Sequence, residues 1–316
     1  MTSDVLSKVP TDLFIGGTWR AASEGGRFDV TDPATGDVIA QVADASAEDG
    51  LAAVAAAHEA GKAWAATPPR QRAEVLRKAW QLMTERADEI ATLISLENGK
   101  ALPDAKGEAT YAAEFFRWYA EETVRMDGMV TTAPSGANRI MVIHQPVGVC
   151  VLVTPWNFPA AMATRKIGPA LGAGCSVVLK PASDTPLTAL LMAQILDDAG
   201  VPAGVVNVVP ARRSGEVVSA MVHDDRVRKL SFTGSTEVGR VLLKEAADTI
   251  VNTSMELGGN APFLVFADAD MDAAIEGAMI ARCATAARRA PQRTGSTSRP
   301  RSPSPSRASW PRRWVR

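Results

Sequence analysis

The sequence predicts an α/β fold: an open, parallel, Rossmann-type sheet with flanking helices. From Val147 onward, short apolar runs alternate with helical patterns, which is typical of a parallel sheet covered by helices on both faces. The runs are almost entirely apolar, as expected for strands buried on both sides. Two of them end in turns that carry polar side chains, and open α/β sheets bind their ligands at that edge.

The chain before this region predicts short strands and then helices. Residues 12–42 contain β-rich runs between Gly, Pro and Asp turns, which we expect to pack on something larger. Ser46 followed by Asp49 predicts a capping box at the start of a helix. Residues 70–96 predict a second, amphipathic helix that ends at an Asn-Gly pair.

Residues 103–125 predict a third helix, whose aromatic side chains are expected in the core. Residues 128–146 alternate around a Pro-Ser-Gly turn, which predicts a hairpin with one wet face. Within the sheet region we expect strands at 149–153, 175–179, 205–209, 229–232 and 253–257, and helices at 160–171, 186–199, 214–221 and 236–247.

Two turns carry the candidate chemistry. In the first, T-P-W-N-F-P at 154–159, two prolines stop the strand from continuing and place Asn157 in a rigid turn. In the second, M-E-L-G-G-N at 255–260, Glu256 ends a strand and two glycines follow. An amide donor and a carboxylate at strand ends suit an oxyanion donor and a general base. The alternative is that both are loop residues that cap helices.

A third turn could meet a phosphate. No G-x-G-x-x-G follows the first strand, but Gly234-Ser235 open a helix directly after a strand, and backbone amides at a helix amino terminus bind anions. A plain helix cap is the alternative for this motif taken alone.

The motifs T-P-W-N-F-P, V-L-K-P-A-S-D-T-P, S-F-T-G-S-T-E-V-G and M-E-L-G-G-N, in this order, resemble the aldehyde dehydrogenase superfamily, most closely its NADP-dependent succinate-semialdehyde dehydrogenase branch. The resemblance covers the chain from about Phe14 to Ala281. It implies an oxidoreductase in which a cysteine thiolate attacks an aldehyde, a hydride leaves to a nicotinamide, and water hydrolyses the thioester to release the acid. It also implies that residues 128–146 serve as an arm for homo-oligomerisation.

The resemblance also assigns roles to single residues. Asn157 is the expected oxyanion donor and Glu256 the expected base that activates water. The expected cofactor contacts are Pro155, Trp156, Lys180, Ser183, Gly234, Ser235, Gly239 and Leu257.

The cofactor and the substrate follow from two further positions. Relatives that prefer NAD often carry a glutamate where this chain has Ser183, and a hydroxyl near Lys180 removes the repulsion of a 2′-phosphate. We therefore expect NADP, with NAD as a possible second cofactor. Arg165, eight residues after Asn157, suits an aldehyde with a distal carboxylate, such as succinate semialdehyde. A helix-surface arginine is the alternative.

The expected nucleophile is missing. The family interval from Glu256 falls on Ala290, and Cys283 lies seven positions early without the expected signature. Residues 282–316 contain ten Arg and no acidic residue, whereas the rest of the chain has 24 basic and 35 acidic groups. Read one base earlier, DNA encoding this tail can give N-G-G-E-A-C with the cysteine at position 290. We therefore expect a frameshift near residue 282, a truncated catalytic domain and no activity.

The expected domains are a dinucleotide-binding domain at 1–251, the start of a catalytic domain at 252–281, and a disordered tail at 282–316. Two readings from other classes stay open: a non-catalytic NADP-binding remnant, and a basic-tailed protein that binds nucleic acid or another polyanion. We expect neither nucleic acid nor membrane as a partner. The histidines and cysteines show no metal-ligand spacing, so no metal site is expected. No signal or membrane-span pattern occurs, so cytoplasm is the expected location.

Overall fold

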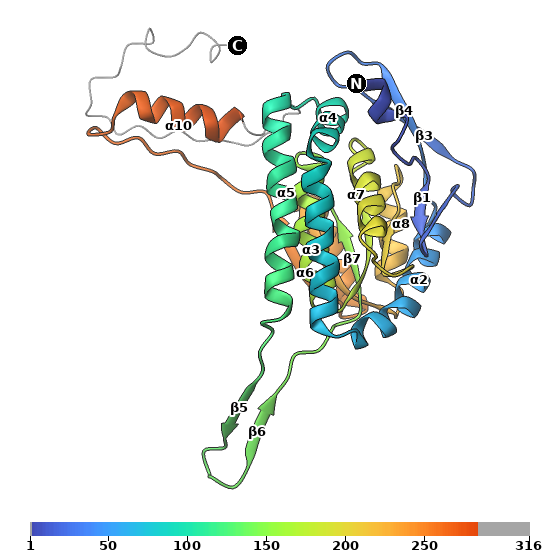
Figure 1. Ribbon diagram of the computed structural model, residues 1–316, viewed down its shortest axis with the longest axis vertical. Helices are drawn as coiled ribbons and strands as arrows, with labels where there is room; N and C mark the ends of the chain where they lie inside the picture. The colour runs from blue at the N-terminus through green and yellow to red at the C-terminus, as the bar shows by residue number, and fades with distance from the viewer. Residues whose placement is uncertain (1, 284–316) are drawn as a thin grey trace. The chain divides into compact units, whose positions relative to one another are not determined.

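The computed structural model describes residues 2–283 and divides the chain into two compact units, one up to Leu257 and one from Gly258. The first unit is built around a seven-stranded sheet with the order β11-β10-β7-β8-β9-β1-β2 (Figure 1). The strands are β1 (Leu13–Ile15), β2 (Thr18–Arg20), β7 (Val149–Val153), β8 (Ser176–Lys180), β9 (Val206–Val208), β10 (Val227–Gly234) and β11 (Asn252–Leu257).

Five of these strands form the parallel sheet that the sequence predicts. β11, β10, β7, β8 and β9 pair in parallel, and every residue of β7 and β8 is buried. At the far edge β1 pairs antiparallel with β9 and with β2, so the sheet is mixed. The α/β prediction is therefore confirmed, and the amino-terminal strands that we expected to pack on something larger extend the sheet itself.

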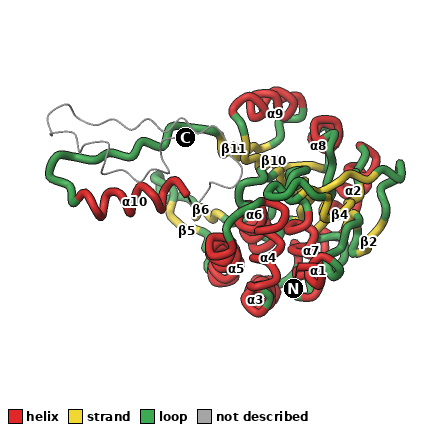
Figure 2. Tube along the Cα trace, turned by 90° about the horizontal axis from the view of Figure 1, so that it is seen from above, coloured by secondary structure: helices red, strands yellow, loops and turns green. Residues whose placement is uncertain are grey.

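Helices cover both faces of the sheet (Figure 2). Along β7, Cys150 and Leu152 enter one apolar cluster, whereas Val149, Val151 and Val153 enter the other, as the two-residue period of a strand requires. The first cluster lies under α3 (Pro69–Glu85), α4 (Ala87–Asn98), α5 (Leu102–Thr123), α6 (Pro159–Gly172) and α7 (Leu187–Asp198); the second lies under α2 (Ala47–Ala66), α8 (Ser214–Val222) and α9 (Thr236–Asp248).

The helices before the central sheet agree only in part with the prediction. The capping box at Ser46 and Asp49 is confirmed at the start of α2. The single helix predicted at 70–96 is wrong, because the helix is interrupted at Arg86, whose φ of −99° and ψ of 18° depart from helical values between α3 and α4. A short amino-terminal helix, α1 (Thr2–Leu6), was not predicted from the sequence.

The hairpin prediction is confirmed in position and wrong in burial. β5 (Met129–Thr132) and β6 (Arg139–Val142) pair antiparallel, and every residue of both strands is exposed. The hairpin extends away from the helices of the first unit, so neither of its faces meets the sheet or the helices (Figure 1). A second hairpin is formed by β3 (Arg27–Thr31) and β4 (Val38–Ala43).

The aromatic residues of α5 are only partly in the core. Phe116 is fully buried, whereas Tyr111 and Trp118 are 47% and 59% exposed, so the expectation of an aromatic core is wrong for these two residues. They face outward because the buried stripe of α5 is made instead by its alanines and Phe116, which pack against α3 and α6.

The second unit contains α10 (Met271–Cys283). Between residues 262 and 266, Val265 makes an isolated bridge and no strand forms. The predicted tail, residues 282–316, lies outside the described residues except for residues 282 and 283, which end α10. Among the helices that the structure describes, none has the length and apolar character required to cross a bilayer.

Candidate functional site

The two candidate catalytic residues lie on the same side of the parallel sheet, at the edge formed by the carboxyl ends of its strands. Val153 of β7 pairs with Phe232 of β10, and the next residue of β10, Thr233, pairs with Glu256 of β11. Asn157 follows the end of β7 after a short turn. Neighbouring strands are about 4.8 Å apart, so the ends of β7 and β11 are separated by roughly 10 Å across β10.

The side chain of Asn157 is available to a ligand. The residue is half-buried, its Oδ1 atom is buried without a hydrogen-bond partner, and no group among residues 2–283 accepts from its amide. An uncommitted amide donor in a rigid turn can stabilise a developing negative charge on a substrate oxygen. This arrangement fits the oxyanion role that the family resemblance assigns to Asn157.

Side chains from α4, α5 and the loop between them hold this turn. The Nδ2 atom of Asn98 donates to the carbonyl of Trp156 at 2.8 Å, and the Nζ atom of Lys100 donates to the carbonyl of Asn157 at 3.1 Å. Lys100 also forms a buried ion pair with Glu108, whose other oxygen accepts from the backbone N–H of Ala160 at 3.0 Å. The main chain of the turn is therefore fixed by partners more than fifty residues away in sequence.

Glu256 is placed differently. The residue is exposed, and its carboxylate makes no hydrogen bond or ion pair with any residue of the described part of the chain. Its negative charge acts on Lys166 of α6. The Nζ atom of Lys166 donates a hydrogen bond to Ser231 Oγ at 2.8 Å. Burial lowers the pKa of Lys166 to about 8, and the negative charge of Glu256 acts in the opposite direction.

The predicted adenosine-side residues follow β8. Lys180 ends this strand and is 5% exposed; burial lowers its pKa to about 8, with the charge of Asp184 acting in the opposite direction. Ser183 is half-buried in the loop before α7. The backbone amides of Leu187 and Thr188, at the start of α7, donate to the buried carboxyl of Glu97 at 2.7 and 2.9 Å.

The predicted phosphate turn lies at the start of α9. Ser235 is the N-cap residue, and its hydroxyl accepts from the backbone N–H of Val238 at 3.3 Å. A Cβ atom at Gly239 would lie 2.5 Å from Leu257 Cδ2, and one at Gly234 would lie 2.4 Å from Phe232 Cζ. Both glycines therefore have a packing role, and their cofactor role stays a prediction.

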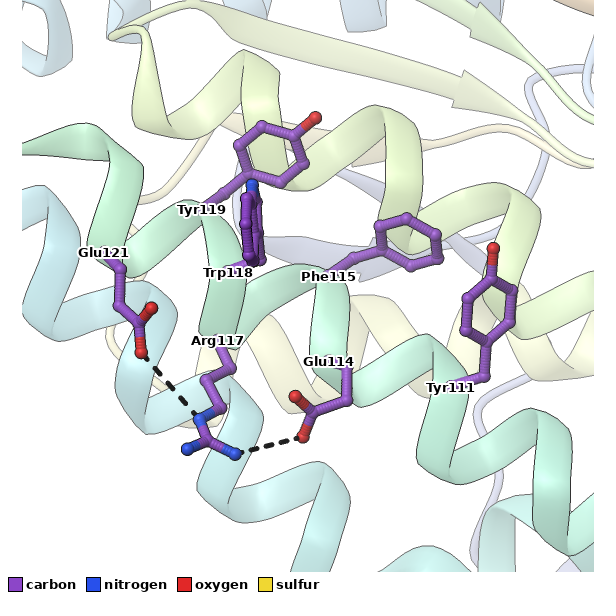
Figure 3. A pocket seen from close by; sticks show the side chains of 7 residues that line it. All are labelled: Tyr111, Glu114, Phe115, Arg117, Trp118, Tyr119 and Glu121. Carbon is purple, nitrogen blue, oxygen red and sulfur yellow. Dashed lines mark ion pairs between the residues drawn. The ribbon is translucent and has the colours of Figure 1, made fainter. Parts of the chain in front are cut away.

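Arg165 lies beside an aromatic groove on α5. Its guanidinium stands 5.3 Å from the ring centroid of Phe115, and it has no ion pair with any residue of the described range 2–283. Figure 3 shows the groove, which is lined by Tyr111, Glu114, Phe115, Arg117, Trp118, Tyr119 and Glu121. Arg117 is paired with Glu114 and Glu121 there, so it does not offer a free cation, whereas Arg165 does.

Within the first unit, up to Leu257, no thiol is placed to act as the nucleophile at the ends of the parallel strands. Cys150 lies within β7 and Cys175 directly before β8; both are buried and share a hydrogen bond. Cys283 is the last residue of α10, in the second unit. Within residues 2–283 no cluster of three metal-ligating side chains occurs.

Sequence reasoning missed Asn98, Lys100, Glu108 and Lys166. Lys166 could have been found from its place one residue after Arg165, in the first helix behind the Asn157 turn. The other three had no local signal, because α5 and the α4–α5 loop reach the turn only through tertiary packing.

Three kinds of comparison point the same way. The profile of the aldehyde dehydrogenase family matches residues 19–290. The chain is similar to a succinate-semialdehyde dehydrogenase of Paenarthrobacter nicotinovorans, at 54% identity over 78% of this chain and 54% of the relative. It is also similar to an NADP(+) succinate-semialdehyde dehydrogenase of Escherichia coli (strain K12), at 50% identity over 85% of this chain and 55% of the relative.

Solved structures give the same result. A crystal structure of an E. coli NADP-dependent enzyme superposes with a TM-score of 0.87 at 48% identity, covering 91% of this chain and 59% of that one. A betaine aldehyde dehydrogenase from Staphylococcus aureus in complex with NAD+ superposes with a TM-score of 0.85 at 30% identity, covering 88% and 56%. The chain thus spans little more than half the length of the relatives that it matches.

Proposed function

The chain belongs to the aldehyde dehydrogenase family, and from this premise we propose that residues 1–251 form the dinucleotide-binding domain of a lineage that oxidises an aldehyde to its acid with NADP. Residues 128–146 are its oligomerisation arm, and residues 252–281 begin the catalytic domain. The observation that carries the proposal is the half-buried Asn157 amide without a partner, two strands from Glu256 on one sheet edge. Asn157 then polarises the aldehyde oxygen, and Glu256 takes a proton from water.

The residues at this edge fit a phosphorylated dinucleotide. Lys180 supplies a buried cation, Ser183 a hydroxyl without charge, and the amino terminus of α9 supplies backbone amides for a phosphate. Pro155 and Trp156 lie in the turn that follows β7, and Leu257 is the last residue of β11. When bound, the cofactor supplies a hydride acceptor. The preference for NADP over NAD follows from the absence of a carboxylate at position 183, and the names of two relatives include NADP(+).

The substrate is an aldehyde with a distal carboxylate, and we propose succinate semialdehyde. Arg165 is exposed, has no ion pair among the described residues, and lies beside the aromatic groove. A planar guanidinium can bind a carboxylate through two hydrogen bonds. Other relatives are named glutarate-semialdehyde dehydrogenases, at 49% and 48% identity, so a substrate one methylene longer is the second candidate.

We further propose that this 316-residue chain binds NADP without turnover, because it has no cysteine at position 290 where the family interval places the nucleophile. The reading frame slips near residue 282, in a gene for an active enzyme. Resequencing the DNA across codons 278–292 tests the slip: one extra or missing base restores the cysteine, and an unchanged reading leaves a cofactor-binding remnant. NADPH formation from succinate semialdehyde by the pure chain would contradict the proposed inactivity.

Cofactor choice is tested on the chain itself by equilibrium titration with NADP+ and NAD+. We expect tighter binding of NADP+. Ser183→Glu should weaken NADP+ binding by about tenfold or more and leave NAD+ binding in place, because two negative groups then face each other. Ser183→Ala is the matched control and should change the NADP+ affinity far less. Equal loss of both cofactors in Ser183→Glu would show that position 183 does not read the 2′-phosphate.

A further inference from the structure

We propose that Asn98, Lys100 and Glu108 are positioning residues that hold the Asn157 turn ready to bind a substrate oxygen. The inference rests on the proposed function only in the identity of that ligand. Its structural basis is that two successive carbonyls of the turn, those of Trp156 and Asn157, each accept from a different side chain of one short segment.

The first part of the argument concerns Asn157 itself. Its side-chain oxygen is buried without a partner, and its amide donates to no residue of the described range. The orientation of this side chain therefore cannot come from its own hydrogen bonds. It must come from the main chain of the turn, and a misplacement of about 1 Å is enough to reduce catalysis substantially.

The second part concerns Lys100. It is 4% exposed and has three contacts: the carboxylate of Glu108, the carbonyl of Asn157, and the ring of Phe158, whose centroid is 3.8 Å from the Nζ atom. A buried ammonium needs all its donors and its charge satisfied. These contacts hold the chain on the carboxyl side of Asn157, because Phe158 is the next residue, whereas Asn98 holds the carbonyl of Trp156 on the amino side.

The third part concerns Glu108. Phe158 occupies the N-cap position of α6 and offers no side-chain acceptor, so the first amides of this helix lack a local cap. Glu108, on α5, accepts from the amides of Ala160 and Ala161 at 3.0 and 3.3 Å. One carboxylate thus caps the helix that follows the turn and also pairs with the lysine that holds the turn.

The shape of the segment depends on Gly99. This residue has φ +78°, in the left-handed region, and ends α4 between Asn98 and Lys100. A Cβ atom there would also lie 2.7 Å from Cγ of Pro33. The reversal at Gly99 lets Asn98 and Lys100 approach the same turn from the end of one helix and the start of the next.

The test follows the side-chain amide of Asn157 by NMR in the cofactor-free chain labelled with 15N-asparagine. The main variant is the double substitution Lys100→Met and Glu108→Gln, which keeps side-chain length, leaves an acceptor for the α6 amides, and buries no unpaired charge. Asn207 is the internal control, since its amide is fixed in the core by bonds to Val177 and Gly204.

We expect the Asn157 signal to shift and broaden while the Asn207 signal stays, and hydrogen exchange across 154–162 to rise by about tenfold. The single variant Lys100→Arg keeps the positive charge and leaves Glu108 in place, so its Asn157 signal should lie closer to that of the wild type than the signal of the double variant does. If the double variant does not fold, Asn98→Ala removes one donor and should move the same signal. An unchanged Asn157 signal in a folded variant, or equal changes at Asn157 and Asn207, would overturn the proposal. Because no cofactor is present, failure of NADP binding leaves this result unaffected.

Discussion

The two strand ends that carry the candidate catalytic groups are held in different ways. Asn157 follows β7, a central strand with all five residues buried, and its turn is bound by Asn98 and Lys100. Glu256 lies on β11, an edge strand whose residues are exposed or half-buried, and its carboxylate has no bonded partner in the described structure. The amide donor is therefore pre-positioned, whereas the carboxylate is free to adopt several rotamers.

The two strand ends differ because β7 lies in the centre of the sheet and β11 lies at its side. β7 has strands on both sides and helices on both faces, so its end is fixed before any ligand arrives. Among the strands that the structure describes, β11 pairs with β10 alone, and it packs against α9. The contrast can be tested with four comparisons, given in order of expected effect.

The largest effect should come from comparing two glutamates. Glu108→Ala leaves Lys100 buried without its partner and uncaps α6, so we expect a loss of about 3–5 kcal/mol in the free energy of unfolding. Glu256→Ala removes an exposed carboxylate without a bonded partner and should change stability by no more than about 0.5 kcal/mol. Chemical denaturation measures both. Equal losses would remove the contrast between the two strand ends.

The second comparison concerns the carboxyl of Glu97, the residue before Asn98, and measures how the free energy of unfolding depends on pH. Burial raises the pKa of Glu97 from an ordinary value of 4.5 to about 7. Between these values the folded chain holds a proton that the unfolded chain has lost, so this group makes stability fall as pH rises, by at most about 1.4 kcal/mol per pH unit. Glu97→Gln cannot titrate and should show a correspondingly flatter profile from pH 4.5 to 7. Parallel profiles would mean that Glu97 is ionised in the folded chain throughout.

A smaller effect is expected at the local cap of α9. Ser235→Ala removes the acceptor for the Val238 amide and should cost about 1 kcal/mol, because only one helix end loses a partner. Ser235→Asp keeps an acceptor and serves as the matched control. A loss as large as that of Glu108→Ala would show that the β10 end of the site is held as firmly as the β7 end.

The smallest effect concerns the affinity for NADP+. Since the pKa of Lys180 is about 8, its charge is lost as pH rises, and we expect NADP+ binding to weaken by about fourfold from pH 7 to 8.5. Lys180→Arg stays charged and should bind with little pH dependence over this range. Isothermal titration at several pH values measures both. The same slope in both proteins would assign the pH dependence to another group.

Much of the fold could be predicted from sequence because its signals are local. The strands at β7, β8, β10 and β11, and the helices between them, follow from apolar runs of strand length and from helical periodicity, and both kinds of pattern depend only on neighbouring residues. The break at Arg86 was missed because the side chain of this residue contacts Gln194 and Asp198, which depend on the position of α7. The exposure of the β5–β6 hairpin was missed because alternation indicates two faces without indicating what either face meets.

The candidate site divides in the same way. Asn157, Glu256 and the Gly234 turn are marked by prolines, glycines and strand ends, which are readable in the chain. Lys100 and Glu108 are residue types that usually lie on the surface, and they are buried because the α4–α5 loop packs on the Asn157 turn and α5 packs on α6. Residues that act on a ligand stand out locally, whereas residues that hold them in place do not.

The close approach of α9 to β11 has a mechanical consequence. With no side chain at position 239, the helix rests directly on Leu257, which is the residue after Glu256. Because of this direct contact, a displacement of α9 is expected to displace β11 as well. A ligand that binds at the amino terminus of α9 and displaces this helix would therefore also move the carboxylate of Glu256. Binding of a phosphate at α9 would then be coupled to the position of the candidate general base.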